Sequence, residues 1–261
     1  MTRDVFGGHD YLPSVFEQWV SDPLARFQAA EVDDDLVAVL RLHPLPGLVM
    51  LLEGMRVAPS WRRQGVARRL LQLAVEEAGR SGFLEVRMVT GSEAPARLAA
   101  SEGFRLVGKV APWTAAALEG GELPSLVFPE GVEAAWPILD ADPCLKAYGG
   151  INPDWSEPLD LDRGLLARLA EAGRLRQGPG ARALAISPDS WGDRLDVSFV
   201  SGRGGALEEL LLQLRYEADT RGLVGVHLLA PRDHPGAASF RRVGYDLADE
   251  SWRLAVHGLK I

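Results

Sequence analysis

The sequence predicts a mixed α/β fold made of two consecutive domains. An apolar run at 48–57 ends at a loop with Pro59, and an amphipathic helix follows at 64–81. The second half repeats this order: a strand, a Gly-rich turn at 201–205, a helix, a strand, a short helix and a last strand. The chain has 261 residues, which suits two domains rather than one.

Each element of the first half follows from its pattern. Asp33-Asp34-Asp35 separates two strands and indicates a hairpin. A right-handed crossover through the helix at 64–81 predicts that the strands before and after it are parallel neighbours. The expected helices are residues 14–21, 64–81 and 94–101, and the expected strands are residues 26–32, 36–42, 48–57, 84–89, 104–110 and 123–128.

The second half begins with a stretch rich in Pro and Gly at 134–155, which is typical of a linker. We place the boundary near Gly131, so the expected domains are 1–131 and 132–261, and we expect strand 123–128 to complete the first sheet. The expected helices of the second half are residues 165–175, 206–220 and 235–242, and its strands are residues 183–186, 194–200, 224–229 and 252–257.

The composition disfavours several classes of partner and function. The net charge of −8 disfavours a nucleic-acid partner, because phosphates attract surplus Lys and Arg. There is no run of 18 apolar residues and no signal pattern, and the one cysteine, Cys144, excludes an internal disulfide. We therefore expect a cytoplasmic protein without a membrane partner. The five histidines lack paired ligand spacing, so we expect no metal.

The turn before the helix at 64–81 predicts an anion site. The first N–H groups of a helix lack intrahelical partners, and the helix dipole is positive there. Gly65 lets the backbone approach phosphate oxygens, and Arg62 and Arg63 add charge-assisted hydrogen bonds. An ordinary crossover with a basic first turn is the alternative interpretation.

Arg62-x-x-Gly65-x-Ala67 resembles the acetyl-CoA pyrophosphate signature of the GNAT superfamily of N-acetyltransferases, and Gly103-Phe104 resembles the pair that closes its later helix. The resemblance implies that acetyl-CoA enters between two splayed strands. It implies that strand residues pair with the pantetheine arm and that the turn holds the pyrophosphate. The family's Asn position falls near Ser92 and its Tyr position on Ala99, so the acid that protonates the thiolate is unassigned. The implied cofactor-binding residues are Met55, Arg56, Val57, Arg62, Arg63, Gln64, Gly65, Val66, Ala67 and Ser92.

Glu53 is the candidate catalytic base. It interrupts an apolar strand, where an unpaired carboxylate is costly and responds by raising its pKa or by finding a partner. Amine acetylation needs a base that removes the ammonium proton, directly or through a water. The structural alternative is an ion pair with Arg56 or another arginine.

The N-terminal GGHDYLP, together with LLEGMRVAP and AYGGINPDWSEP, is similar to the histidine N-acetyltransferase-like branch of the superfamily. This resemblance implies that the acceptor is a free amino acid and that His9, Asp10 and Tyr11 lie on the loop over the acceptor. A capped turn with a half-buried tyrosine is the alternative. His234 is expected to be a capping or surface group.

The sequence thus indicates tandem GNAT-like domains, the second degenerate because Arg203-Gly204-Gly205-Ala206 does not fit the signature. The expected function is acetyl transfer from acetyl-CoA to a primary amine of a small molecule. The alternatives are a non-catalytic acyl-CoA-binding or interaction protein and a protein N-acetyltransferase. Acceptor, acyl length and oligomeric state stay open.

Overall fold

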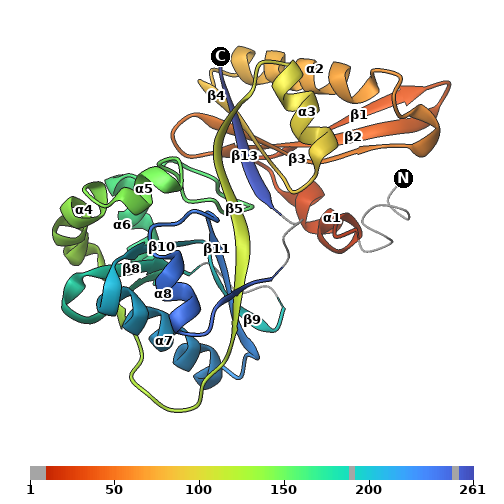
Figure 1. The fold of residues 1–261 in the computed structure, drawn as a ribbon. Coiled ribbons are helices and arrows are strands. Elements are labelled where there is room, and N and C mark those ends of the chain that lie inside the picture. The colour runs from red at the N-terminus through yellow and green to blue at the C-terminus, as the bar shows by residue number, and fades with distance from the viewer. Residues whose placement is uncertain (1–9, 188–191, 249–252) are drawn as a thin grey trace. The chain divides into compact units, whose positions relative to one another are not determined.

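The computed structural model describes residues 10–187, 192–248 and 253–261, and the chain forms two compact units (Figure 1). The first unit is Met1–Leu106 with Val256–Ile261, and the second is Val107–Ala255. The units divide inside strand β5 (Arg105–Ala116), whereas the sequence placed the domain boundary near Gly131. The strand expected at 104–110 continues to Ala116. The two units therefore divide within a continuous strand, where the sequence has no linker-like stretch.

The first unit contains a sheet in the order β1-β2-β3-β4. The β1–β2 and β2–β3 pairs are antiparallel and the β3–β4 pair is parallel, which confirms the crossover expected from the sequence. Near the chain end, the N–H of Ile261 donates to the carbonyl of Leu84 (3.0 Å). The elements of this unit are α1 (Leu12–Ser21), β1 (Arg26–Val32), β2 (Asp35–Leu45), β3 (Val49–Val57), η2 (Pro59–Trp61), α2 (Val66–Arg80), β4 (Glu85–Thr90) and α3 (Glu93–Ser101).

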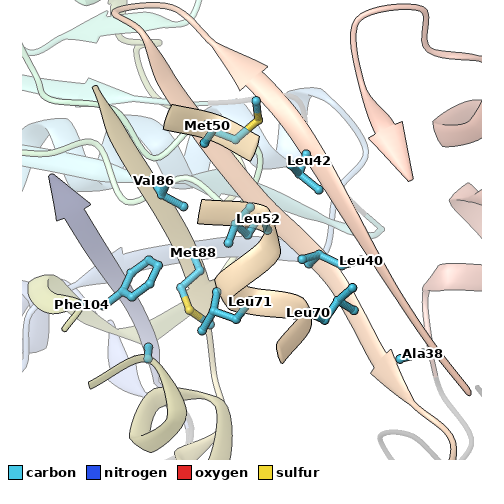
Figure 2. Close-up of a cluster of buried hydrophobic side chains, with 13 residues drawn as sticks. Ala38, Leu40, Leu42, Met50, Leu52, Leu70, Leu71, Val86, Met88 and Phe104 are labelled. Carbon is cyan, nitrogen blue, oxygen red and sulfur yellow. The ribbon is translucent and has the colours of Figure 1, made fainter. Parts of the chain in front are cut away.

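The core of the first unit lies between the sheet and α2. Because side chains alternate along a strand, every second residue of β2, β3 and β4 faces this helix. The apolar stripe of α2 supplies Leu70, Leu71, Ala74 and Ala78. Figure 2 shows the leucines packed against side chains of three strands. The strand residues of the cluster are Ala38, Leu40, Leu42, Met50, Leu52, Val86 and Met88.

Strand β3 has an irregular carboxyl end. Its register against β2 shifts between Val39 and Arg41, and Gly54 on β3 has φ of +66° there. A glycine tolerates this left-handed conformation, which makes it the ordinary residue of a bulge. Glu53 and the residues before it alternate regularly, so Glu53 points to the face opposite α2.

The second unit contains two sheets. In one, β5 pairs antiparallel with β11, which pairs parallel with β9, and β12 also pairs with β5. The other is antiparallel, in the order β10-β8-β7-β6. The elements of the second unit after β5 are β6 (Ser125–Leu126), η3 (Pro129–Gly131), α4 (Val132–Asp140), α5 (Pro143–Ala147), α6 (Arg163–Glu171), β7 (Leu175–Gln177), η4 (Pro179–Ala181), β8 (Ala183–Ile186), β9 (Arg194–Val197), β10 (Phe199–Gly202), α7 (Gly204–Thr220), β11 (Gly225–Ala230), α8 (Ala237–Arg242) and β12 (Asp246–Leu247). Strand β13 (Leu254–Lys260) follows them in the chain.

Three sequence expectations for this region are wrong. The stretch at 134–155 is not a linker, because it carries helices α4 and α5 and buries Tyr148 completely. The strand expected at 194–200 is two strands that part at Ser198 and join different sheets. The strand expected at 123–128 shortens to β6, which pairs with β7 instead of completing the first sheet. Local pattern cannot reveal such pairings, because they depend on distant partners.

Candidate active site

The loop between β3 and α2 leaves the start of the helix open. Gly65 precedes the helix with φ of +84°, and a Cβ added there would meet no atom within 4 Å. No side chain caps the helix, and its first turn carries no acidic residue. The residues from Arg62 to Gly65 are exposed, and Val66 and Ala67 are half-buried. Unpaired N–H groups at an exposed helix start can bind an anion.

Two side chains fix the shape of this loop. Nε of Arg62 donates to the carbonyl of Val57 (3.2 Å), and Nε2 of Gln64 donates to the carbonyl of Ser60 (2.7 Å). Arg63 has φ of +64°, a left-handed conformation that is uncommon outside glycine. The loop is therefore held by its own side chains, with its arginines at the surface.

Strands β3 and β4 part beside this loop. Their parallel pairing covers Val49–Leu52 against Glu85–Met88, while β3 continues to Val57 and β4 to Thr90. Past Leu52, the backbone of β3 is therefore outside that ladder. Met55 and Val57 pack against the core on the α2 side. The splayed strands that the family resemblance implies are present in this unit.

Glu53 belongs to a charged cluster. Its Oε1 accepts from Nη1 of Arg41 and lies 3.3 Å from Nδ1 of His43. Arg41 also reaches Oδ2 of Asp22 at 2.5 Å, and its guanidinium lies 4.7 Å from the ring of Trp19. Glu53 is therefore not an unpaired carboxylate: it has an arginine partner, as the structural alternative requires, and that partner is Arg41.

The sequence interpretation missed Arg41 and His43. Both lie on β2, where they alternate with the core residues Leu40 and Leu42, and Arg41 is 4% exposed. Two basic residues at alternating positions of an apolar strand were the available signal. The pairing of Arg41 with Glu53 across β2 and β3 brings them to the face that bears the carboxylate.

Asp10 and Arg56 form a buried bidentate pair. Nε of Arg56 donates to Oδ2 of Asp10 (2.9 Å) and Nη2 donates to Oδ1 (2.6 Å). The hydrogen bond from Arg56 lowers the pKa of Asp10, and burial raises the pKa of Tyr11. Asp10 also accepts from the N–H of Leu12 (3.1 Å), which fits the capped-turn alternative for this loop. His9 lies outside the described residues.

The start of α3 has neither the amide nor the phenol of the family pattern. Ser92 is exposed and precedes the helix, and its N–H donates to Oγ1 of Thr90 (3.0 Å). Ala99 is fully buried and part of the core. The described residues of α3 thus offer no phenol at the position of the expected acid.

Among residues 10–187, 192–248 and 253–261, no group of three or more His, Cys, Asp or Glu side chains could hold a metal ion. In the same part of the chain, no helix combines the length and apolar character needed to cross a membrane.

The first part of the chain is similar in sequence to known proteins. Residues 2–104 match the acetyltransferase (GNAT) family. Histidine N-acetyltransferase of Oreochromis niloticus is 37% identical over 89 residues, which is 34% of this chain and 26% of that protein. The enzyme of the same name from Scomber australasicus is 37% identical over 93 residues, again 34% and 26%. The match thus spans about a quarter of the length of these curated relatives.

Solved structures extend the likeness in fold to nearly the whole chain. A GCN5-related N-acetyltransferase from Sphaerobacter thermophilus has a TM-score of 0.61 and 15% identity, covering 95% of this chain and 85% of that one. A GCN5-related N-acetyltransferase from Kribbella flavida has a TM-score of 0.50 and 16% identity, covering 99% and 67%. The part of the chain that matches the acetyltransferase (GNAT) family, residues 2–104, thus includes the open helix start and the splayed strands.

Proposed function

We propose that this chain is an N-acetyltransferase that moves an acetyl group from acetyl-CoA to the primary amine of a small molecule, an amino acid. The exposed, uncapped start of α2 behind Arg62–Gly65 carries the proposal, because it is suited to a pyrophosphate. The names of the two fish relatives support an amino acid as the acceptor.

In this proposal acetyl-CoA lies along the splayed end of β3. The backbone of Met55, Arg56 and Val57 pairs with the pantetheine arm, and the loop from Arg62 to Ala67 holds the pyrophosphate. The backbone of Arg56 is the binding group, because its side chain is engaged by Asp10. Ser92 lies at the start of α3 and lacks an amide, so its contribution is at most one hydroxyl.

The reaction in this proposal is direct transfer. The Glu53 carboxylate accepts a proton from the acceptor's ammonium group, directly or through a water, which frees the nitrogen lone pair. The nitrogen attacks the thioester carbon, the C–S bond breaks, and CoA leaves as a thiolate, which takes up the second proton that the nitrogen loses as the amide forms. A thiol with an ordinary pKa of about 8.5 is a tolerable leaving group without a dedicated acid.

Arg41 and His43 would act through Glu53. The guanidinium of Arg41 fixes one carboxylate oxygen, and the half-buried His43 stands beside the same oxygen. They are positioning residues in this proposal. Asp10 and Tyr11 would border the acceptor from the start of α1.

The test is CoA release from acetyl-CoA, detected with a thiol reagent, against a panel of free amino acids, polyamines and aminoglycosides. We expect turnover with an amino acid, and a loss of at least about 100-fold in Glu53→Gln with acetyl-CoA binding retained. Glu76→Gln is the matched control, because Glu76 is an exposed carboxylate of α2. Equal turnover in Glu53→Gln and wild type would remove Glu53 from the mechanism.

Two observations favour a second candidate, a non-catalytic acyl-CoA-binding protein. Glu53 already has Arg41 as a partner, and Ala99 offers no acid. This candidate predicts acetyl-CoA binding without turnover on any amine of the panel, so the same assay separates the two.

A further inference from the structure

The second unit has its own parting of strands. β9 pairs with β11 over Arg194–Val197 and Gly225–Leu228, and after Ser198 the chain leaves as β10 to pair with β8. β11 continues to Ala230. A helix follows each diverging strand, α2 after β3 and α7 after β10. The second unit thus repeats the plan in which acetyl-CoA is placed in the first.

Tyr148 spans this second opening. It follows α5 and is fully buried. Its hydroxyl donates to the carbonyl of Leu229 on β11 (2.9 Å) and accepts from the N–H of Val200 on β10 (3.2 Å). Its ring centroid lies 4.4 Å from that of Phe199. One side chain therefore satisfies a backbone group on each of the two parted strands.

His234 forms a hydrogen bond with the other backbone polar group of Val200, its carbonyl. Its Nδ1 accepts from the N–H of Gly236 (2.9 Å), so the ring proton is on Nε2, which donates to the carbonyl of Val200 (3.1 Å). The ring stacks on Phe240 with centroids 4.8 Å apart, and it meets Tyr148 edge-on at 5.6 Å. Both backbone polar groups of Val200 are thus engaged by buried side chains.

The carboxylate of Asp142 lies at the end of β10, just before α7 begins. Oδ1 of Asp142 accepts from the N–H of Cys144 at the start of α5 (2.9 Å), and Oδ2 accepts from the N–H of Gly202 (3.1 Å). Arg203 alone separates β10 from α7, whereas residues 58–65 separate β3 from α2. The second unit has an internal carboxylate next to its helix start, where the first has an exposed basic loop.

Two glycines shape the position of Tyr148. Gly149 has φ of +75°, and a Cβ there would lie 1.9 Å from the carbonyl oxygen of Val107. A Cβ on Gly108 would lie 2.6 Å from the carbonyl oxygen of Tyr148. The backbone after α5 therefore lies directly on β5, a contact that only glycine allows.

We propose that Tyr148, which follows directly on α5, is a built-in occupant of the strand opening in the second unit, so that this unit takes no acyl-CoA and the chain binds a single acyl-CoA molecule. An extended amide arm can bind between parted strands only through free backbone groups. Here those groups already have buried partners, and an entering arm would have to expel a buried ring and leave polar groups unpaired. The inference rests on the proposed function, which places acetyl-CoA in the first unit.

The first test is the stoichiometry of acetyl-CoA binding to the full chain by calorimetry. We expect one site per chain, an affinity about 100-fold weaker in Gly65→Asp, and unchanged binding in Arg203→Ala. Two sites in the wild type, or one site of wild-type affinity remaining in Gly65→Asp, would overturn the inference. No binding to the wild type would instead refute the proposed function of the first unit. The role of Tyr148 would then be decided by the second test.

The second test replaces the occupant. In Tyr148→Ala we expect p-cresol, the side chain as a free molecule, to raise the unfolding midpoint by about 5 °C, toluene to raise it less, and neither to change the wild type. A folded Tyr148→Ala that ignores p-cresol would contradict the inference. Tyr148→Phe serves if the alanine variant does not fold: we expect a lower midpoint and acetyl-CoA affinity within twofold of wild type. A phenylalanine variant as stable as wild type would contradict it equally.

Discussion

The two units differ most at the connection between a strand and the helix that follows it, β3 to α2 in the first unit and β10 to α7 in the second. In the first, residues 58–65 form an exposed basic loop, and the helix start beyond Gly65 is uncapped. In the second, Arg203 alone joins β10 to α7, and Tyr148, His234 and Asp142 engage the surrounding backbone. We therefore expect an acyl-CoA site only beside the exposed, uncapped helix start of the first unit. Four predictions test this comparison.

The largest effect is expected at Gly149. Gly149→Ala would force a Cβ against the carbonyl of Val107 in a left-handed conformation, so we expect a loss of roughly 3–5 kcal/mol in the free energy of unfolding. Gly150→Ala is the matched control, because its φ of +76° is similar but a Cβ there meets nothing within 4 Å. We expect it to cost about 1 kcal/mol. Denaturant unfolding measures both, and equal losses would show that Tyr148 is not held by this contact.

The next effect concerns the open loop. Gly65→Asp adds a carboxylate where an anion is expected, so acetyl-CoA affinity should fall by about 100-fold, or roughly 3 kcal/mol. Gly82→Asp is the control: Gly82 lies just past the other end of α2, has φ of +82°, and also has open space around a Cβ. Calorimetric titration of both variants decides the matter, and equal affinities would place the pyrophosphate elsewhere.

The third prediction is a pH dependence in the second unit. Burial lowers the pKa of His234 to about 4, below its ordinary value of 6.5. The unfolded state then binds more protons between these values, so this contribution is complete above pH 6.5 and is lost as pH falls toward 4. The contribution is worth about 3 kcal/mol. His234→Gln should flatten the stability profile between pH 6.5 and 4, and an unchanged slope would assign the dependence to other groups.

The smallest effect is expected at the loop tether. Gln64→Ala removes the hydrogen bond to the carbonyl of Ser60 and loosens the loop, so acetyl-CoA affinity should fall by about two- to fivefold. Gln72→Ala is the control, because Gln72, inside α2, also donates a side-chain hydrogen bond, to Glu102 (2.8 Å). A larger loss in the control than in Gln64→Ala would contradict the tether.

Much of the fold and part of the site follow from local pattern. The strands at 26–32 and 183–186 coincide with β1 and β8, and the helix before Ser81 and the short helix before Gly103 lie where periodicity places them. The signature around Gly65 also lies at the start of α2, as expected. These features depend on side chains close in sequence, which periodicity and turn chemistry report directly.

The sequence by itself determined the order of the elements and the open basic turn of the first unit, because both are set by neighbouring residues. Only the tertiary structure decided which polar groups are already engaged. Arg41 meets Glu53 because β2 pairs with β3, and Tyr148 meets Val200 and Leu229 across the fold of the second unit. The partners of a buried group come from distant parts of the chain, and a local pattern carries no information about them.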